Sequence, residues 1–150
     1  EIVAFDTDMV GPYGYCADIS RAFVVGNKFN DEQKKLYSMA MEQIDFNSRL
    51  IKNGVNFKEF TEKSWVLPKE YYPNRYSVMV HGIGLCDEWP AIRYPTDGGE
   101  RGGTFQKNMT ITVESYIGKV GGKEGVKLEQ QYLIGENGLE LMSHHPLEDI

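Results

Sequence analysis

Met-Thr-Ile-Thr-Val-Glu-Ser-Tyr-Ile at residues 109–117 and Val-Lys-Leu-Glu-Gln-Gln-Tyr-Leu-Ile at residues 126–134 are the two stretches that decide the fold. Both are rich in Ile, Val, Leu, Thr and Tyr, which predicts a β-strand for each. The segment 118–122 between them is rich in glycine, as a tight turn requires. The sequence therefore predicts two strands joined by a turn, each with one glutamate in its middle.

Turn and capping residues place the other elements around these strands. Residues 1–8 and 15–25 are predicted to form a hairpin around the turn at 11–14. A helix is expected from the N-cap Asn30 to Gly54, and a second from Asn56 to about Leu67. Three more segments follow: a strand at 76–84, a loop at 93–104 and a short strand at 136–142. This order predicts an α+β fold with a mostly antiparallel sheet.

The composition argues against several classes of protein. The chain has 150 residues, the size of one domain, and a net charge of −6 with its basic residues scattered. Without a basic stripe we expect no nucleic-acid partner, and no apolar run approaches the roughly 20 residues that cross a bilayer. Cys16 and Cys86 lack the spacing of a metal finger, so we expect a reduced, cytoplasmic setting away from membranes. Residues 1–5 already have the pattern of a strand, so we expect further residues ahead of them.

Acidic residues recur on the predicted strands, where Asp and Glu are uncommon and are rarely buried unless they are paired or bind a cation. The acids concerned are Asp6, Asp8, Asp18, Glu114 and Glu129. Any one of them alone is explained as a polar residue on a solvated face. Together with the isolated His81 they indicate carboxylates around one imidazole, which repel one another unless cations lie between them. Such oxygen-rich ligation suits Mn, Fe, Co, Zn or Mg.

Four motifs, in order along the chain, resemble the pita-bread enzymes, a superfamily that includes methionine aminopeptidases, Xaa-Pro aminopeptidases and creatinases. They are Phe5-Asp6-Thr7-Asp8 with Gly14-Tyr15-Cys16-Ala17-Asp18-Ile19-Ser20-Arg21, His81-Gly82-Ile83-Gly84-Leu85, Asn108-Met109-Thr110-Ile111-Thr112-Val113-Glu114, and Gly125-Val126-Lys127-Leu128-Glu129. The resemblance implies a curved antiparallel sheet with helices on its outside. It also implies that residues 1–150 are the C-terminal, metal-binding catalytic domain of a longer protein.

The same resemblance implies a ligand set for two metal ions. Asp18 and Glu129 would bridge the ions. Asp6 or Asp8, or both, would bind the first ion, because neither has the usual spacing from the bridging aspartate. His81 and Glu114 would bind the second ion.

One departure from the peptidases of this superfamily bears directly on activity. They carry a second histidine seven positions after the first, and that position here is Glu88. A carboxylate cannot donate the hydrogen bond that an imidazole gives to a developing oxyanion. The usual proline after the strand glutamate is also replaced, by Ser115. The metals are thus expected to be retained while peptide hydrolysis is disfavoured.

A narrower resemblance fits these departures. The double aspartate and the run His-Gly-Ile-Gly-Leu-Cys-Asp-Glu-Trp-Pro at 81–90 resemble the dimethylsulfoniopropionate (DMSP) lyases built on this fold. These bacterial, cytoplasmic and typically homodimeric enzymes cleave a small zwitterion into dimethyl sulfide and acrylate. The resemblance implies Asp87 as the catalytic base and two divalent ions, with iron ranked ahead of Mn, Co or Zn.

A sulfonium favours an aromatic face, for which Trp89, Tyr71, Tyr72 and Tyr76 are candidates, and Trp89 and Tyr76 are the predicted substrate-binding pair. Two other functions remain open at this stage. One is a metallo-aminopeptidase or prolidase acting on Xaa-Pro peptides, and the other is a non-catalytic binding module.

Overall fold

The computed structural model describes residues 1–26 and 28–148 of the chain. Its largest element is a five-stranded antiparallel sheet with the order β6-β5-β7-β8-β9. The strands are β5 (Val78–Gly82), β6 (Ala91–Arg93), β7 (Thr110–Gly118), β8 (Gly125–Ile134) and β9 (Leu139–Leu141). The α+β class with an antiparallel sheet is therefore confirmed.

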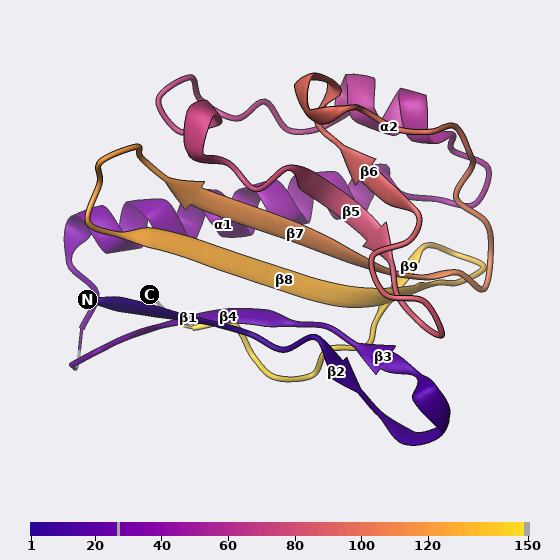
Figure 1. Ribbon diagram of the computed structural model, residues 1–150, viewed down its shortest axis with the longest axis horizontal. Coiled ribbons are helices and arrows are strands. Elements are labelled where there is room, and N and C mark those ends of the chain that lie inside the picture. The colour runs from indigo at the N-terminus through magenta and orange to yellow at the C-terminus, as the bar shows by residue number, and fades with distance from the viewer. Residues whose placement is uncertain (27, 149–150) are drawn as a thin grey trace.

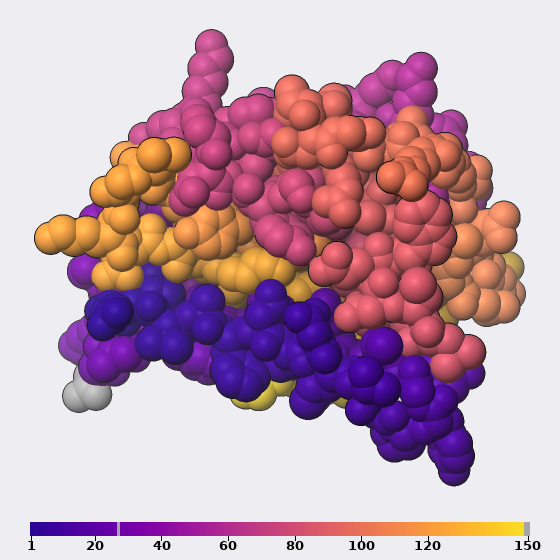
Figure 2. Space-filling view, in the orientation of Figure 1, coloured from indigo at the N-terminus to yellow at the C-terminus, as the bar shows by residue number. Residues whose placement is uncertain are grey.

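An N-terminal hairpin runs along β8 on the side of the sheet away from the long helix (Figure 1). It consists of β1 (Ile2–Asp6) paired with β4 (Ser20–Val24), and of β2 (Met9–Val10) paired with β3 (Cys16–Ala17). The short helix η1 (Pro12–Gly14) forms its tip. In Figure 2 this indigo hairpin meets the pink segment that follows β5, and the gold surface of β8 is visible between them.

One long helix, α1 (Asp31–Leu50), covers the other face of β7 and β8. The predicted capping box is confirmed, because the Asn30 side chain accepts from the Gln33 backbone and the Gln33 side chain accepts from the Asn30 backbone. Strand alternation gives the sheet an apolar face toward α1 and a polar face toward the hairpin. The apolar side chains beneath α1 include Ile111, Val113, Ile117, Val126 and Leu128.

The two predicted helix ends were wrong for tertiary reasons. The first helix stops at Leu50 rather than Gly54, because Ile51 turns into the core and the Gly54 backbone donates to the Phe105 carbonyl. The second, α2 (Phe57–Lys63), stops short of Leu67 because the Trp65 backbone donates to the Asn47 side chain on α1.

The predicted loop at 93–104 contains short ordered elements. Strand β6 begins before it, at Ala91, and pairs with β5, and the short helix η3 (Pro95–Asp97) lies within it. A further short helix, η2 (Tyr72–Asn74), precedes β5. None of the helices in the described residues is long and apolar enough to cross a membrane.

Arg21 fastens the C-terminal segment to the sheet. Its guanidinium is buried and donates to the carbonyls of Ser20, Glu129, His145 and Pro146. These bonds join β4, β8 and the segment after β9 at one point.

Replacing Arg21 by methionine is expected to lower the free energy of unfolding by about 3 kcal/mol, because the buried carbonyls of Ser20 and Glu129 lose a charged donor. The matched control is Arg49→Met, since Arg49 is exposed and its one ion pair with a described residue is with Asp45, one turn earlier in α1. The loss of unfolding free energy in Arg49→Met should stay below about 1 kcal/mol. Urea denaturation of both variants measures the two free energies of unfolding. Equal losses would show that the hydrogen bonds of Arg21 do not stabilise the fold in this way.

Candidate metal centre

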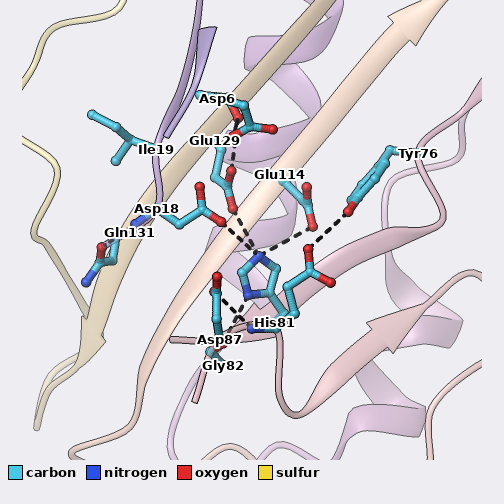
Figure 3. A network of polar contacts seen from close by, with 12 residues as sticks. Asp6, Asp18, Ile19, Tyr76, His81, Gly82, Asp87, Glu114, Glu129 and Gln131 are labelled. Atoms are coloured by element: carbon cyan, nitrogen blue, oxygen red, sulfur yellow. Dashed lines mark hydrogen bonds and ion pairs between the residues drawn. The ribbon is translucent and has the colours of Figure 1, made fainter. Parts of the chain in front are cut away.

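Three strands bring one histidine and two glutamates to the polar face of the sheet (Figure 3). Glu114 on β7 and Glu129 on β8 are direct partners in the antiparallel register, so their side chains lie on the same face. His81 on β5 pairs with Thr112, two residues before Glu114. Asp18 reaches the same place from the hairpin, between β3 and β4.

The His81 ring lies at the centre of this group. Its Nε2 atom is 3.2 Å from Glu129 Oε1, 3.6 Å from Asp18 Oδ2 and 3.8 Å from Glu114 Oε1. All four side chains are buried. Asp18 Oδ1 and Glu114 Oε1 are buried without a hydrogen-bond partner among the described residues. Unpaired buried carboxylate oxygens are costly unless a cation satisfies them, so this donor set fits a metal ion.

The pKa values of these side chains also indicate that negative charge is in excess in this group. Burial, with the charges of Glu129 and Asp6, raises the pKa of Asp18 to about 8. Burial likewise raises the pKa of Glu114 to about 7, although Lys127 opposes the shift. Burial alone would lower the pKa of His81, but its hydrogen bond to Glu129 and the charge of Glu114 raise it to about 9. Burial and close negative charges thus favour the neutral form of the Asp18 and Glu114 carboxyl groups when no cation lies between them.

The other predicted ligands and the predicted base lie around this centre. Asp8, Asp18 and Asp87 offer carboxylate oxygens that all lie within 4.8 Å of one another. Asp6 accepts from the Ser20 hydroxyl at 2.6 Å, and its other oxygen is 3.4 Å from Lys127 Nζ. The structure thus brings together all seven residues predicted for metal binding and catalysis, while their individual roles stay predictions.

The two aromatic residues predicted to bind substrate, Tyr76 and Trp89, lie in different surroundings. The Tyr76 hydroxyl donates to Glu88 at 3.3 Å, and the Tyr76 ring lies 4.7 Å from Lys127 Nζ, at the edge of the centre. Trp89 is 54% exposed, and the Arg101 guanidinium lies over its ring at 5.7 Å. Geometry therefore favours Tyr76 over Trp89 as a wall of the site.

The other tyrosine candidates lie elsewhere. Tyr71 is buried in the core. The Tyr72 ring is covered by Arg75 at 3.8 Å.

Lys127 and Ser20 are two members of the centre that the sequence did not single out. Lys127 stands two residues before Glu129, and on a strand that spacing places both side chains on one face. The same spacing separates Ser20 from Asp18. The period-two rule, applied to every polar residue beside a predicted ligand, was the signal that could have found them.

Gly82 is required for the close approach of the segment that carries Asp87. A Cβ atom at Gly82 would lie 2.1 Å from the Trp89 carbonyl oxygen and 2.8 Å from Pro90 Cδ. The Gly82 backbone also donates to the Pro90 carbonyl at 2.9 Å. The chain therefore returns across Gly82 after passing Asp87, and only glycine leaves room for it.

Gly82→Ala is expected to lower the free energy of unfolding by about 1–3 kcal/mol, because the returning segment must move away from β5. Gly84→Ala is the matched control, since its new Cβ would meet only Thr110 Oγ1 at 3.6 Å, an ordinary contact. Urea denaturation compares the two variants. A loss in Gly84→Ala as large as that in Gly82→Ala would refute the close-approach argument.

The model of Metallopeptidase family M24 matches residues 1–136 of the chain. The chain belongs to this family. Solved M24 structures share its fold: the prolidase from Pyrococcus horikoshii is 26% identical with a TM-score of 0.79, over 99% of this chain and 42% of that one. The prolidase from Pyrococcus furiosus is 27% identical with a TM-score of 0.78, over 97% of this chain and 42% of that one. The predicted pita-bread fold is confirmed.

Among curated M24 relatives, the protein named dimethylsulfoniopropionate lyase DddP from Roseovarius nubinhibens is 39% identical over 99% of this chain and 34% of its own length. The Xaa-Pro dipeptidase of Pyrococcus furiosus is 32% identical over 86% of this chain and 36% of its own length. The resemblance to the DMSP lyases is confirmed. The chain spans about a third of the length of these relatives.

Proposed function

We propose that this chain is the metal-binding part of a DMSP lyase that eliminates dimethyl sulfide from DMSP and releases acrylate. The observation that carries the proposal is the position of Asp87, whose carboxylate lies within 4.8 Å of Asp8 and Asp18, two predicted ligands of one metal ion. The 39% identity to the Roseovarius lyase supports it. Glu88, in place of the second histidine of the peptidases, disfavours the hydrolytic alternative.

The elimination requires a base next to the carbon that carries the acidic hydrogen. In DMSP this is the carbon bonded to the carboxylate, and its proton passes to the Asp87 carboxylate. The electron pair of that C–H bond forms the carbon–carbon double bond as the carbon–sulfur bond breaks. The products are acrylate and neutral dimethyl sulfide. Asp87 is partly buried, and its Oδ1 atom accepts from the Glu88 backbone at 3.0 Å, which orients the carboxylate.

Two divalent ions, with iron as the first candidate and Mn, Co or Zn as alternatives, are proposed for the six ligands Asp6, Asp8, Asp18, His81, Glu114 and Glu129. Bound there, they supply Lewis acidity that stabilises negative charge on a substrate carboxylate. Asp18 and Glu114 each have one buried oxygen that no other described residue hydrogen-bonds, and these oxygens are proposed to bind the ions. The Tyr76 ring is proposed to contact the sulfonium, because a cation is attracted to an aromatic face.

The remaining proposals follow the DMSP lyases. We propose a cytoplasmic homodimer whose partner is a small zwitterion, with no nucleic-acid or membrane partner.

The direct test is to incubate the metal-loaded full-length protein with DMSP and to measure dimethyl sulfide in the headspace and acrylate in solution. Equal molar amounts of the two products are expected. If neither is formed while Gly-Pro or Ala-Pro is hydrolysed, the chain is a peptidase and the proposal is wrong. If the protein binds two metal ions and acts on neither substrate, the lyase proposal is equally wrong.

A further inference from the structure

Lys127 is a buried ammonium inside the carboxylate cluster. Its side chain is 11% exposed, although lysine rarely lies in the interior without a partner. Its Nζ atom is 2.6 Å from Glu114 Oε2, 3.4 Å from Asp6 Oδ2 and 3.5 Å from Glu129 Oε2. The Tyr76 ring covers the ammonium at 4.7 Å. Lys127 therefore contacts predicted ligands of both metal ions.

These contacts decide which oxygen of Glu114 is free. Lys127 takes Oε2, and Oε1 stays without a hydrogen-bond partner among the described residues, 3.8 Å from His81 Nε2. Glu114 therefore presents one oxygen toward the side of His81, another predicted ligand of the same ion. Removal of the ammonium would leave both oxygens available.

The Lys127 ammonium also offsets part of the negative charge of the predicted ligands. The predicted ligands include five carboxylates: Asp6, Asp8, Asp18, Glu114 and Glu129. Two divalent ions leave one of these five negative charges uncancelled, and Lys127 cancels it, so that the negative charge remaining in the site is that of Asp87, the proposed base. An exposed lysine would be screened by water, but at this depth its charge acts on the ions through a medium of low dielectric constant.

We propose that Lys127 is a positioning residue that restricts Glu114 to one coordinating oxygen and balances the charge of two divalent ions and their six predicted ligands. The ammonium weakens metal binding, because it repels the ions and competes with them for Glu114 and Asp6. Because the ammonium draws electron density from Glu114 and Asp6, these ligands neutralise less of the positive charge of the ions. The ions are then stronger Lewis acids toward a substrate carboxylate. This inference rests on the proposed metal centre but not on the identity of the substrate.

Three substitutions in the full-length protein separate charge from hydrogen bonding. Lys127→Met removes both, Lys127→Gln keeps a donor without the charge, and Lys127→Arg keeps both. The affinity for Mn²⁺ and Fe²⁺ is measured by competition with a chromogenic chelator, and the number of bound ions by elemental analysis. Neither measurement needs a substrate. Circular dichroism before and after metal addition shows which variants are folded.

Lys127→Met is expected to bind the ions about tenfold or more tightly and to release them more slowly to the chelator, because a repulsive charge is lost. Lys127→Gln should bind tighter than the wild type as well, and Lys127→Arg should restore the wild-type affinity. The turnover number should fall in Met and Gln but not in Arg. If Met does not fold, the comparison of Gln with Arg decides the question.

Unchanged or weaker metal binding in a folded uncharged variant would overturn the proposal, as would an arginine variant that behaves like the methionine one. A wild-type protein that binds no metal would instead refute the proposed function. The two failures are therefore distinguishable.

Discussion

Replacement of Asp87 by asparagine is expected to lower dimethyl sulfide release by a factor of about 100 to 10,000, the range that a general base contributes. The amide has almost the same shape as the carboxylate but cannot accept a proton from carbon. Asp87 lies in the segment that returns across Gly82, with its carboxylate close to Asp8 and Asp18. Initial rates and elemental analysis of the same preparation measure activity and metal content together.

The metal content of Asp87→Asn distinguishes two roles for this residue. As a base, Asp87 can be replaced with both ions still bound, because none of the six predicted ligands has changed. If Asp87→Asn loses an ion in parallel with its activity, Asp87 is a ligand and the base must be sought elsewhere. Glu88→Gln is the companion variant, since Glu88 is the adjacent acid but is exposed and accepts from Tyr76. Its activity should exceed that of Asp87→Asn by at least tenfold if Asp87 is the base.

The strands that carry the ligands were predictable because their apolar pattern is long and continuous. The prediction 109–117 is shifted by one residue from the observed β7, and the prediction 126–134 differs from β8 by one residue at its start. Strand β6 was not predictable in the same way, because Ala91–Arg93 is short and is held by pairing with β5. The helix ends depended on single long-range bonds, such as that of Asn47 with the Trp65 backbone. Such bonds leave no local trace in the sequence.

Much of the centre was predictable because acids are unusual on strands, and the structure gathers all of those singled out. Lys127 escaped because a lysine on a strand ordinarily points to solvent. Its burial follows from the register, in which Glu114 lies opposite Glu129, and from the hairpin, which packs along β8 and brings Asp6 to Lys127. Trp89 was chosen as a substrate contact for its chemistry alone, whereas in the structure its ring is exposed beside Arg101. Residue type thus indicated the ligands, and tertiary packing decided their neighbours.

Glu129→Gln is expected to weaken metal binding by about 100-fold or more and to abolish dimethyl sulfide release. Even a residue that only supports a ligand is worth about 10–100-fold in affinity, and Glu129 is proposed to bridge both ions. Its side chain is fully buried, with Oε1 at 3.2 Å from His81 Nε2 and Oε2 at 3.0 Å from the Ser20 hydroxyl. Glutamine keeps the volume and one acceptor oxygen, but it removes a charge and places an amide where an ion requires an oxygen.

Glu140→Gln is the matched control, because Glu140 is an exposed glutamate on the neighbouring strand β9 and changes the same charge by the same chemistry. It should keep two ions per chain and full activity. A Glu129→Gln protein that keeps both ions would rule out the bridging role of Glu129. The other proposed bridging residue, Asp18, is not expected to hold the two ions together alone. If Glu129→Gln keeps one ion, the ion that is lost is the one whose binding requires Glu129. Activity measured at that stoichiometry then shows whether elimination requires both.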